Sequence, residues 1–467
     1  MSCWRSSEEP TDKWHDLVVT MKVEVSYGDG IVSLSIPDAN LERVIRPWQD
    51  EAKADGAVRH FAGLPRAMAG PDAKCFQAEI AGKRLCVLLD DATRDEPFEP
   101  IFKQLFVLLT RASFVHFLIC TGTHEPDTPG NSRIKEQITQ AAGAAGLARF
   151  EMRVHDCEHG EFVHAGTTAR GTEVIYNALA DQADAFLVLS DVKVHYFAGY
   201  SNPVKNFLPG ICAFATTERN HSLALDEKST FGTHPWHKDR RRRSNPLAED
   251  QLDGMKLIVK DRPVFTLITI TTAGLIRWVR LGPVKSVSAE AFATVDQRNT
   301  HTVTPVGRLI VSPGGLPNDI DLYIAQRALE LTRSAVTDNG EILFLAACPG
   351  GVGEKKTLEN FYNLLTAPIE QILQSIERQY KLYSHKPYKF ARMIRRLRCI
   401  WVHSQMPDDM LTAAHLHPAH DPQAVVDGWL AEQPDAKIMV VDGANKIALH
   451  AAQSRSSIKT AAAPAKL

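Results

Sequence analysis

The stretch AFLVLSDVKVHYFAGYSNPVKNFLPG, residues 185–210, decides the fold class of this chain. It opens with five apolar residues, and a short continuous apolar run of this kind is typical of a strand buried on both faces of a parallel sheet. The run then changes to a loop that holds His195, a stiff Asn-Pro pair and Lys205. In α/β proteins, ligands bind beyond the carboxyl ends of the strands, so we expect this loop to belong to a site.

The same change from apolar run to polar loop occurs twice more in the first half of the chain. Both RLCVLLDDATR (84–94) and FVHFLICTGTHEP (114–126) pass from a predicted strand into a loop with ionisable residues. A second set of strands is predicted at RLIVS (308–312), EILFLAA (341–347), CIWVHS (399–404) and KIMVV (437–441). Strands that alternate with helices favour α/β architecture with largely parallel sheets. We therefore expect two α/β domains with an active-site cleft between them.

The predicted division of the chain has four parts. They are a polar tail at 1–20, a first domain at 21–287, a second domain at 288–455 and a tail at 456–467. Alternating apolar and polar residues around a Gly-Asp-Gly turn predict a β-hairpin at 21–37, and a meander is expected at 263–283. Helices are expected at 132–145 and 319–332.

Composition limits the possible partners. The chain has 467 residues, a formal net charge of −2 and a charged fraction of 23%, so nothing indicates a nucleic-acid or anionic-membrane partner. Its apolar runs are far shorter than the ~18 to 20 residues that span a bilayer. The N-terminus has no apolar segment of a secretory signal. Eight cysteines occur without a C-x-x-C pair, so we expect reduced thiols in a cytoplasmic protein.

Taken singly, the ionisable residues of these loops have ordinary structural alternatives. The apolar neighbours of Lys205 would lower its pKa and make it a nucleophile, but a lysine that extends to solvent from an apolar loop is the alternative. Asp91 and Arg94 could form a structural ion pair. His124 and His195 could be structural histidines with satisfied hydrogen bonds.

Taken together and in order, the motifs resemble the nickel-pincer lactate racemase family of 2-hydroxyacid racemases and epimerases. The similar motifs are DDATR (90–94), GTH (122–124), HYFAGYS (195–201) with the following Lys205 and LPG, ERNH (218–221), SNPLAEDQ (244–251), SPGGLPNDIDLY (312–323) and SHKPYKFAR (384–392). The resemblance covers most of residues 21–450. It makes the first domain the cofactor-binding and catalytic one, with the second domain closing over the substrate.

The resemblance implies a pyridinium bisthiocarboxylic acid mononucleotide that holds nickel, made by cofactor-synthesis proteins of the host. Lys205 would be tethered to it through a thioamide, and His221 would be the protein's nickel ligand. Asp91 is grouped with the cofactor-binding residues and could orient Arg94 or His124. The phosphate is expected at turns with free backbone N–H groups, although simple tight turns are the alternative. These turns are Gly166, Thr167 and Thr168, and Gly199, Tyr200 and Ser201.

The implied reaction inverts a hydroxyl-bearing carbon by moving a hydride, with a 2-hydroxy acid as the small-molecule substrate. Such a racemase needs one proton acceptor for each enantiomer, and His124 and His195 suit these roles. Arg94 would hold the substrate carboxylate. Tyr323, Ile324 and Arg327 are expected on the substrate side.

The chain departs from the family pattern at several positions. Asn202-Pro203 replaces a glycine-rich run, and Ala248 replaces a histidine. Arg327 stands where a lysine is usual. Ile324 stands where a glutamine is usual, so an apolar wall replaces a polar contact. We therefore expect a substrate other than lactate, with a larger or apolar side chain.

Two other functions compete with this one. A nicotinamide-type 2-hydroxyacid oxidoreductase would carry G-x-G-x-x-G after an early strand, which this sequence lacks. A non-catalytic nickel-cofactor-binding protein would need Lys205 and His221 but not both other histidines. Three features are interpreted as structural: the histidines at 155, 159 and 164, the glycine-rich GGVGEKKT (350–357) and the basic HKDRRRR (237–243).

Overall fold

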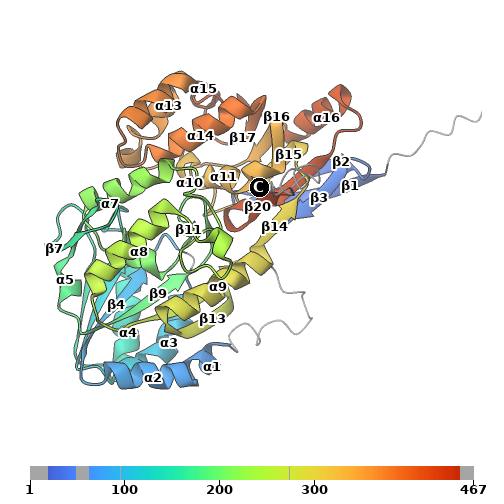
Figure 1. Ribbon diagram of the computed structural model, residues 1–467. Coiled ribbons are helices and arrows are strands. Elements are labelled where there is room, and N and C mark those ends of the chain that lie inside the picture. The colour runs from blue at the N-terminus through green and yellow to red at the C-terminus, as the bar shows by residue number, and fades with distance from the viewer. Residues whose placement is uncertain (1–18, 49–62, 95, 273, 453–467) are drawn as a thin grey trace, which may run out of the picture.

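The computed structural model describes residues 19–48, 63–94, 96–272 and 274–452. Within these ranges the main strands form two six-stranded sheets, one in each of two units that lie one above the other in Figure 1. Within these two sheets, all neighbouring strands pair in parallel except β12 and β13. The predicted α/β class with two largely parallel sheets is confirmed.

The first sheet carries the site. Its strands, in spatial order, are β13 (Leu275–Pro283), β12 (Val264–Thr272), β9 (Ala185–Asp191), β4 (Arg84–Asp90), β5 (Phe114–Cys120) and β6 (Phe150–Val154). Residues of β4 alternate between two cores: Leu85 and Val87 join one, and Cys86 and Leu88 join the other. Because helices cover both faces, β4 and β9 are buried almost throughout, which explains their continuous apolar sequences.

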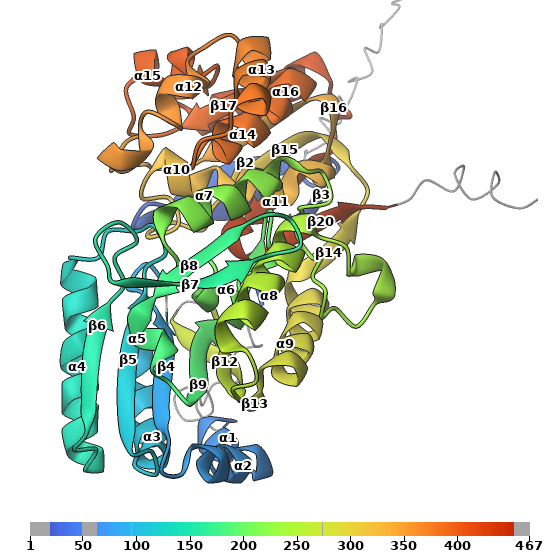
Figure 2. The ribbon, with the colours of Figure 1, turned by 60° about the vertical axis from the view of Figure 1, so that its left-hand side comes forward.

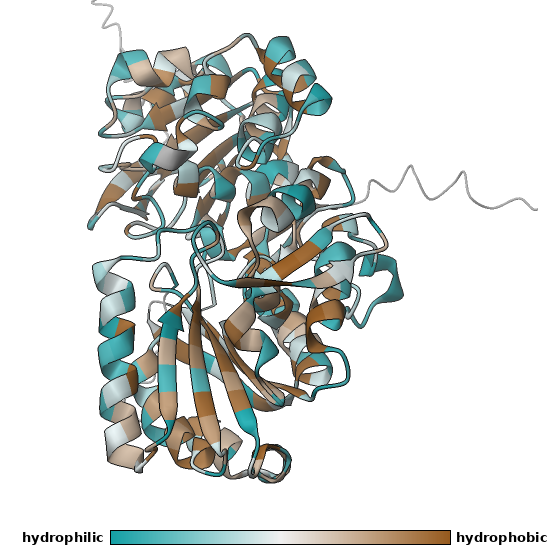
Figure 3. Cartoon of the chain, turned by 90° about the vertical axis from the view of Figure 1, so that its left-hand side faces the viewer, coloured by the Kyte–Doolittle hydropathy of each residue, from teal (hydrophilic) through white to brown (hydrophobic). Residues whose placement is uncertain are grey.

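Helices enclose the first sheet on both sides (Figure 2). They are α1 (Gly63–Ala69), α2 (Pro71–Ile80), α3 (Phe98–Leu109), α4 (Pro129–Ala145), α5 (Ala178–Asp181), α6 (Pro203–Phe207), α7 (Phe214–Ser222), α8 (Pro246–Val259) and α9 (Val284–Asn299). Figure 3 shows the mostly apolar strands of this sheet beside helices with hydrophilic outer residues. The helix expected at 132–145 is confirmed as α4, and it begins earlier because Thr128 accepts a hydrogen bond from the Asn131 N–H.

The second sheet has strands β18 (His417–Pro418), β17 (Cys399–His403), β16 (Val336–Leu345), β15 (Val306–Ser312), β19 (Ile438–Asp442) and β3 (Leu41–Ile45). Its helices are α10 (Leu322–Ala325), α11 (Arg327–Thr332), α12 (Tyr362–Leu365), α13 (Ile369–Arg378), α14 (His385–Arg396), α15 (Asp408–Ala413) and α16 (Pro422–Glu432). The small paired strands are β7 (Phe162–Thr167) with β8 (Glu173–Asn177), β10 (Val194–His195) with β11 (Gly199–Tyr200), and β14 (Thr300–Val303) with β20 (Ala448–Ala451).

The helix expected at 319–332 begins later and is split into α10 and α11. The extended backbone of Asp321 ends the preceding loop, and its carboxylate accepts a hydrogen bond from the Ile324 N–H at 2.7 Å. Asp319 stays in the loop, where it accepts from the backbone N–H groups of Gly28 and Ala347. The antiparallel pair β12–β13 agrees with the predicted meander.

The first described residues pack with the second unit, although 21–287 was predicted as one domain. The expected hairpin forms as β1 (Thr20–Tyr27) and β2 (Gly30–Pro37), and the following β3 pairs with β19 as an edge strand. Apolar hairpin residues share a core with the second sheet: Val23, Val25, Leu34 and Ile36. The physical reason is that the hairpin's apolar face covers one face of that sheet.

None of the helices in the described ranges combines the length and apolarity that a bilayer crossing requires.

We predict that truncating Ile36 destabilises the protein much more than truncating Ile31 of the same strand. Ile36 is fully buried, whereas Ile31 is 60% exposed. Ile36→Ala should lower the free energy of unfolding by about 2–5 kcal/mol, and Ile31→Ala by less than about 0.5 kcal/mol. Urea unfolding of both variants measures this difference, and equal losses would contradict the packing of the hairpin on the second sheet.

Candidate active site

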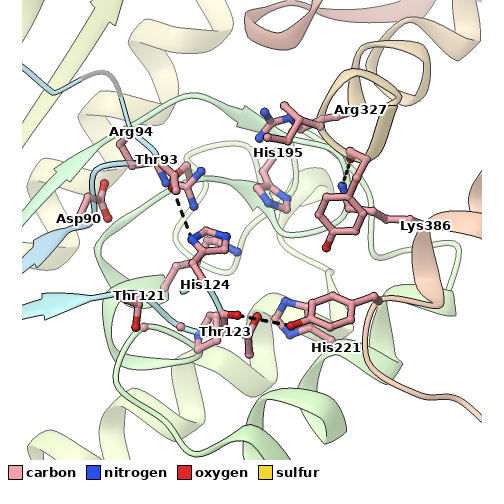
Figure 4. Close-up of a pocket in the computed structure, with 18 of the residues that line it drawn as sticks. Asp90, Thr93, Arg94, Thr121, Thr123, His124, His195, His221, Arg327 and Lys386 are labelled. Carbon is pink, nitrogen blue, oxygen red and sulfur yellow. Dashed lines mark hydrogen bonds between the residues drawn. The ribbon is translucent and has the colours of Figure 1, made fainter. Parts of the chain in front are cut away.

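A cavity of about 400 Å³ lies where the carboxyl ends of the first sheet face the second unit. Most of the residues predicted for the site line it. They are Arg94, His124, His195, Ser201, Lys205 and His221 from the first unit, and Tyr323, Ile324 and Arg327 from the second. Figure 4 shows the three imidazoles with Arg94 on one side and Arg327 on the other.

His124 is oriented by a buried carboxylate. Its Nδ1 lies 2.8 Å from Asp91 Oδ2, and the Thr93 hydroxyl donates to the other carboxylate oxygen at 2.6 Å. Burial alone would raise the pKa of Asp91, but His124 and Arg94 lower it below its usual value. An ionised carboxylate only accepts hydrogen bonds, so Nδ1 of His124 carries the hydrogen and Nε2 is left with a free lone pair. Asp91 therefore acts through His124, since it does not itself line the cavity.

His195 is held differently. The Ala198 N–H donates to its Nδ1 at 3.3 Å, so the hydrogen of the neutral ring lies on Nε2. The ring stacks on Tyr196 with centroids 5.2 Å apart and meets Phe197 edge-on at 4.5 Å. Burial, followed by the charges of Lys205 and Arg327, lowers the pKa of His195 well below 6.5. Nε2 of His124 thus offers a lone pair, whereas Nε2 of His195 offers a hydrogen.

His221 is suited to bind a metal through one nitrogen. Its Nδ1 lies 3.1 Å from the Thr217 carbonyl oxygen, which can only accept, so Nδ1 donates and the Nε2 lone pair is available. Burial, with the charge of Lys205, lowers the pKa of His221 to about 3 and keeps the ring neutral. The described residues contain no group of three or more His, Cys, Asp or Glu side chains arranged around a metal position. A metal at His221 would therefore need donor atoms from a non-protein ligand, and the residues fit a nickel-pincer cofactor.

Lys205 lies in α6 and is partly buried. Asn202 caps this helix by accepting from the Val204 N–H at 2.9 Å, and Pro203 occupies the first turn, where no N–H is needed. This pair replaces the glycine-rich family pattern with a short, well-defined helix start. Burial first, and then Arg94, lower the pKa of Lys205 to about 7. Close to neutral pH, much of this amine is unprotonated and nucleophilic.

The second unit provides a cationic and aromatic wall. Lys386 hydrogen-bonds the Tyr323 carbonyl oxygen, and its Nζ lies 3.5 Å from the centroid of the Tyr323 ring. Arg327 has no hydrogen-bond or ion-pair partner in the described chain, and burial lowers its pKa to about 10. Ile324 adds an apolar side chain to the same wall.

The turn at 166–168 lies away from the cavity, although it was expected to bind phosphate. Gly166 packs beside Leu257, and the Thr168 hydroxyl donates to Asp250 at 2.5 Å. Thr167 and Thr168 border a separate surface depression. The residues of this turn therefore serve the packing of the β7–β8 hairpin on α8.

Gly199 and Tyr200 are also outside the cavity lining, and only Ser201 of that turn reaches it. A Cβ at Gly199 would lie 1.7 Å from the Thr233 carbonyl oxygen, so glycine is required by the close approach of two backbones. The Tyr200 hydroxyl donates to Asp296 at 2.7 Å, and its ring stacks on Phe292. Ala248, which replaces a family histidine, is buried in α8 and does not line the cavity either.

Three sequence features were interpreted as structural: the histidines at 155, 159 and 164, the basic run at 237–243 and the glycine-rich segment at 350–357. His155 donates from Nε2 to the Cys212 carbonyl oxygen, and His159 is exposed beside Asp156. Arg242 of the basic run forms an ion pair with Asp296 at 2.7 Å. The glycine-rich segment differs in part, because Glu354 and Thr357 reach the cavity.

Sequence reasoning missed several residues of the lining. These include Asp90, Thr121, Thr123, Lys193, Asn206, Tyr383, His385 and Lys386. The last three lie in or beside the family-like SHKPYKFAR motif, which was noted without assigning roles to its members. The adjacent ionisable residues His385 and Lys386 in that motif were the available signal.

Together, these features define a two-unit α/β protein with an enzyme-like site between its units. Two family models match the chain, the lactate racemase N-terminal domain over residues 27–232 and the lactate racemase C-terminal domain over residues 303–448. The chain therefore belongs to the lactate racemase family, an isomerase family.

Named relatives agree with this assignment. A lactate racemase of Thermoanaerobacterium thermosaccharolyticum is 25% identical over 347 residues, which is 73% of this chain and 76% of the relative. A lactate racemase of Lactiplantibacillus plantarum is 22% identical over 369 residues, or 76% of this chain and 82% of the relative.

Solved structures share the fold. The lactate racemase apoprotein of T. thermosaccharolyticum superposes with a TM-score of 0.77 at 20% identity, covering 92% of this chain and all of that one. A protein of Thermotoga maritima gives a TM-score of 0.60 at 13% identity, covering 81% of this chain and 96% of the other.

We predict that Lys205 of the cofactor-free protein reacts with an acylating reagent as a group of pKa about 7. Only the neutral amine is nucleophilic, so its labelling rate should be half-maximal near pH 7 and level off above that pH. Pulsed acetylation followed by peptide mass spectrometry measures this profile. In urea-unfolded protein the same lysine should titrate near the ordinary value of about 10.4. Identical profiles in folded and unfolded protein would contradict the buried position.

Proposed function

We propose that this chain is a racemase or epimerase that inverts the hydroxyl-bearing carbon of a 2-hydroxy acid by reversible hydride transfer. The observation that carries the proposal is the convergence of Lys205, His124, His195 and His221 on one cavity. These four residues come from separate elements of the first unit, namely the loop after β5, the short strand β10 and the helices α6 and α7. A protein that only binds the cofactor would have no use for the two additional imidazoles.

Lys205 would hold a nickel-pincer nucleotide through a thioamide, and His221 would bind its nickel through Nε2. When bound, this group supplies the centre that accepts and returns the hydride. A buried amine with a pKa of about 7 supports the attachment, because a neutral amine can attack without prior deprotonation. The Nδ1–Thr217 hydrogen bond supports the ligand role, because it fixes the tautomer that leaves Nε2 free.

The hydroxyl proton of one enantiomer would pass to Nε2 of His124. Asp91 would stabilise the imidazolium that forms, since its carboxylate lies 2.8 Å from Nδ1. His195 would serve the hydroxyl on the opposite face, and to accept its proton the ring would carry its own hydrogen on Nδ1 in place of the 3.3 Å contact with the Ala198 N–H, which leaves the Nε2 lone pair free. One acid/base group for each enantiomer is what a reversible inversion requires.

Arg94 and Arg327 would hold the substrate carboxylate and orient the carbon that reacts. Neither guanidinium has a hydrogen-bond or ion-pair partner within the described part of the chain, so each can offer a bidentate contact. They come from different units, and a substrate between them would exclude water from the cavity.

The apolar wall at Ile324 favours a 2-hydroxy acid with a side chain larger than the methyl group of lactate. Ile320 and Tyr323 line the same side of the cavity. Each additional buried CH₂ group strengthens binding by about 0.8 kcal/mol. An acid whose side chain has two or three more such groups than lactate should therefore bind clearly more tightly.

We predict that Lys205 is the attachment point and that the equally buried Lys193 is not. Expression beside a cofactor-making system should give wild-type protein with a mass increase and one equivalent of nickel. Lys205→Ala should lose both. Lys193→Ala, which removes another cavity lysine whose pKa is lowered, to about 8, should keep the adduct. Intact-protein mass and metal analysis measure the three proteins. Folded wild type without adduct or nickel would refute the proposal.

We predict that wild-type protein racemises aromatic or branched 2-hydroxy acids with a higher kcat/KM than lactate. Ile324→Gln should shift the ratio of the two kcat/KM values toward lactate by about tenfold, equivalent to about 1.4 kcal/mol. Chiral chromatography of timed reactions gives both rates. The exposed Ile31→Gln serves as control and should leave the ratio unchanged. A wild-type preference for lactate would contradict the expected substrate class.

A further inference from the structure

The second unit brings a fourth imidazole into the cavity. His385, the first residue of α14, is 3% exposed and lines the cavity beside His221. The centroids of the two rings are 5.7 Å apart. Nothing in the proposed proton transfers uses this residue, so its position needs a separate explanation.

A hydrogen bond to Tyr380 fixes the tautomer of His385. The phenolic oxygen lies 2.8 Å from Nδ1, and neither side chain has another hydrogen-bond partner in the described ranges. If Nδ1 carried the hydrogen, the phenolic hydrogen of the partly buried Tyr380 would find no acceptor among the described residues. Tyr380 therefore donates to Nδ1, and the hydrogen of the neutral ring lies on Nε2. His385 is left with a hydrogen-bond donor and no protein acceptor for it.

The neighbouring imidazoles consequently differ in character. Nε2 of His221 offers a lone pair, because its Nδ1 donates to Thr217. Nε2 of His385 offers an N–H. Such a pair is complementary to a metal ion and to an electron-rich atom bonded to that metal.

Two contacts hold the pair in place. The Phe197 ring meets His221 edge-on at 5.4 Å and His385 edge-on at 4.9 Å, so it keeps the two imidazoles apart and in fixed orientation. The Leu382 N–H donates to Glu218 Oε2 at 2.8 Å. Since Glu218 and Leu382 each lie three residues before one of the histidines, this bond sets the segments side by side across the two units.

We propose that His385 is a positioning residue whose Nε2–H donates a hydrogen bond to a metal-bound sulfur of the cofactor held at His221. The inference rests on the proposed function. A hydrogen bond to a metal-bound sulfur withdraws electron density from it, which makes the centre a better hydride acceptor. The same bond holds the sulfur in place, and ligand atoms that are oriented in this way retain a metal more firmly. The donor comes from the second unit, so the unit that selects the substrate also tunes the centre that reacts.

The test uses cofactor-loaded wild-type protein and the variants His385→Leu, His385→Gln and Tyr380→Phe. Nickel loss to a chelator and the visible absorption band of the loaded protein are measured, neither of which depends on turnover. His385→Leu should lose nickel about 10–100-fold faster and shift the band. His385→Gln keeps an N–H donor and should restore part of both properties. Tyr380→Phe leaves the imidazole in place but frees its tautomer, so it should change both in the direction of His385→Leu.

The exposed His159→Leu is the matched control and should behave as wild type. Loaded His385→Leu with wild-type nickel retention and absorption would overturn the inference and leave the proposed function standing. Wild-type protein without adduct or nickel would overturn both. Thermal unfolding of each variant separates loss of the fold from loss of the hydrogen bond.

Discussion

The parallel register of β4, β5 and β9 is the constraint on which the rest of the site depends. Asp90 pairs with Cys120 and Leu89 pairs with Leu189, so the three strands end within a residue or two of one another. The loops that follow must then start from one edge of the sheet. This shared edge is why Asp91 and His124, 33 residues apart in sequence, meet at 2.8 Å.

The cavity at this edge also concentrates positive charge, which acidic side chains offset only in part, as Asp191 does for Lys193 at 3.8 Å. Arg94, Lys193, Lys205, Arg327 and Lys386 all line the cavity, and burial lowers the pKa of the last four. For Lys205 the folded pKa of about 7 is below the unfolded value, so the unfolded chain binds this proton more tightly. This lysine therefore destabilises the folded state, and the loss of stability becomes smaller as the pH rises from 7 to about 10.4. A cavity that bears such a cost is built for anionic ligands, which would offset it on binding.

The sequence predicts the strands and the loops that line the cavity well because both have local signals. Continuous apolar runs mark β4, β5 and β9, and polar residues directly after them, such as His124 and His195, must lie at the sheet edge. Orientation inside a loop has no comparable signal. Gly199 was expected to bind phosphate, yet its lack of a side chain serves the close approach of Thr233. His385 has an ordinary position at a helix start, and only the packing of the second unit on Phe197 and His221 brings it into the cavity.

The two units also cannot be understood independently. The first unit holds the lysine and three of the imidazoles, but its cavity is open on the side where Tyr323, Ile324 and Arg327 complete it. The contacts that join the units lie directly at the site: Leu382 bonds Glu218, and the Tyr383 hydroxyl reaches the Thr123 carbonyl oxygen at 3.4 Å, one residue before His124. Any displacement of the second unit therefore moves Tyr323, Ile324 and Arg327 relative to His124 and His221. Under the proposed function, the same few bonds would set both the selection of the substrate and the geometry of the reacting centre.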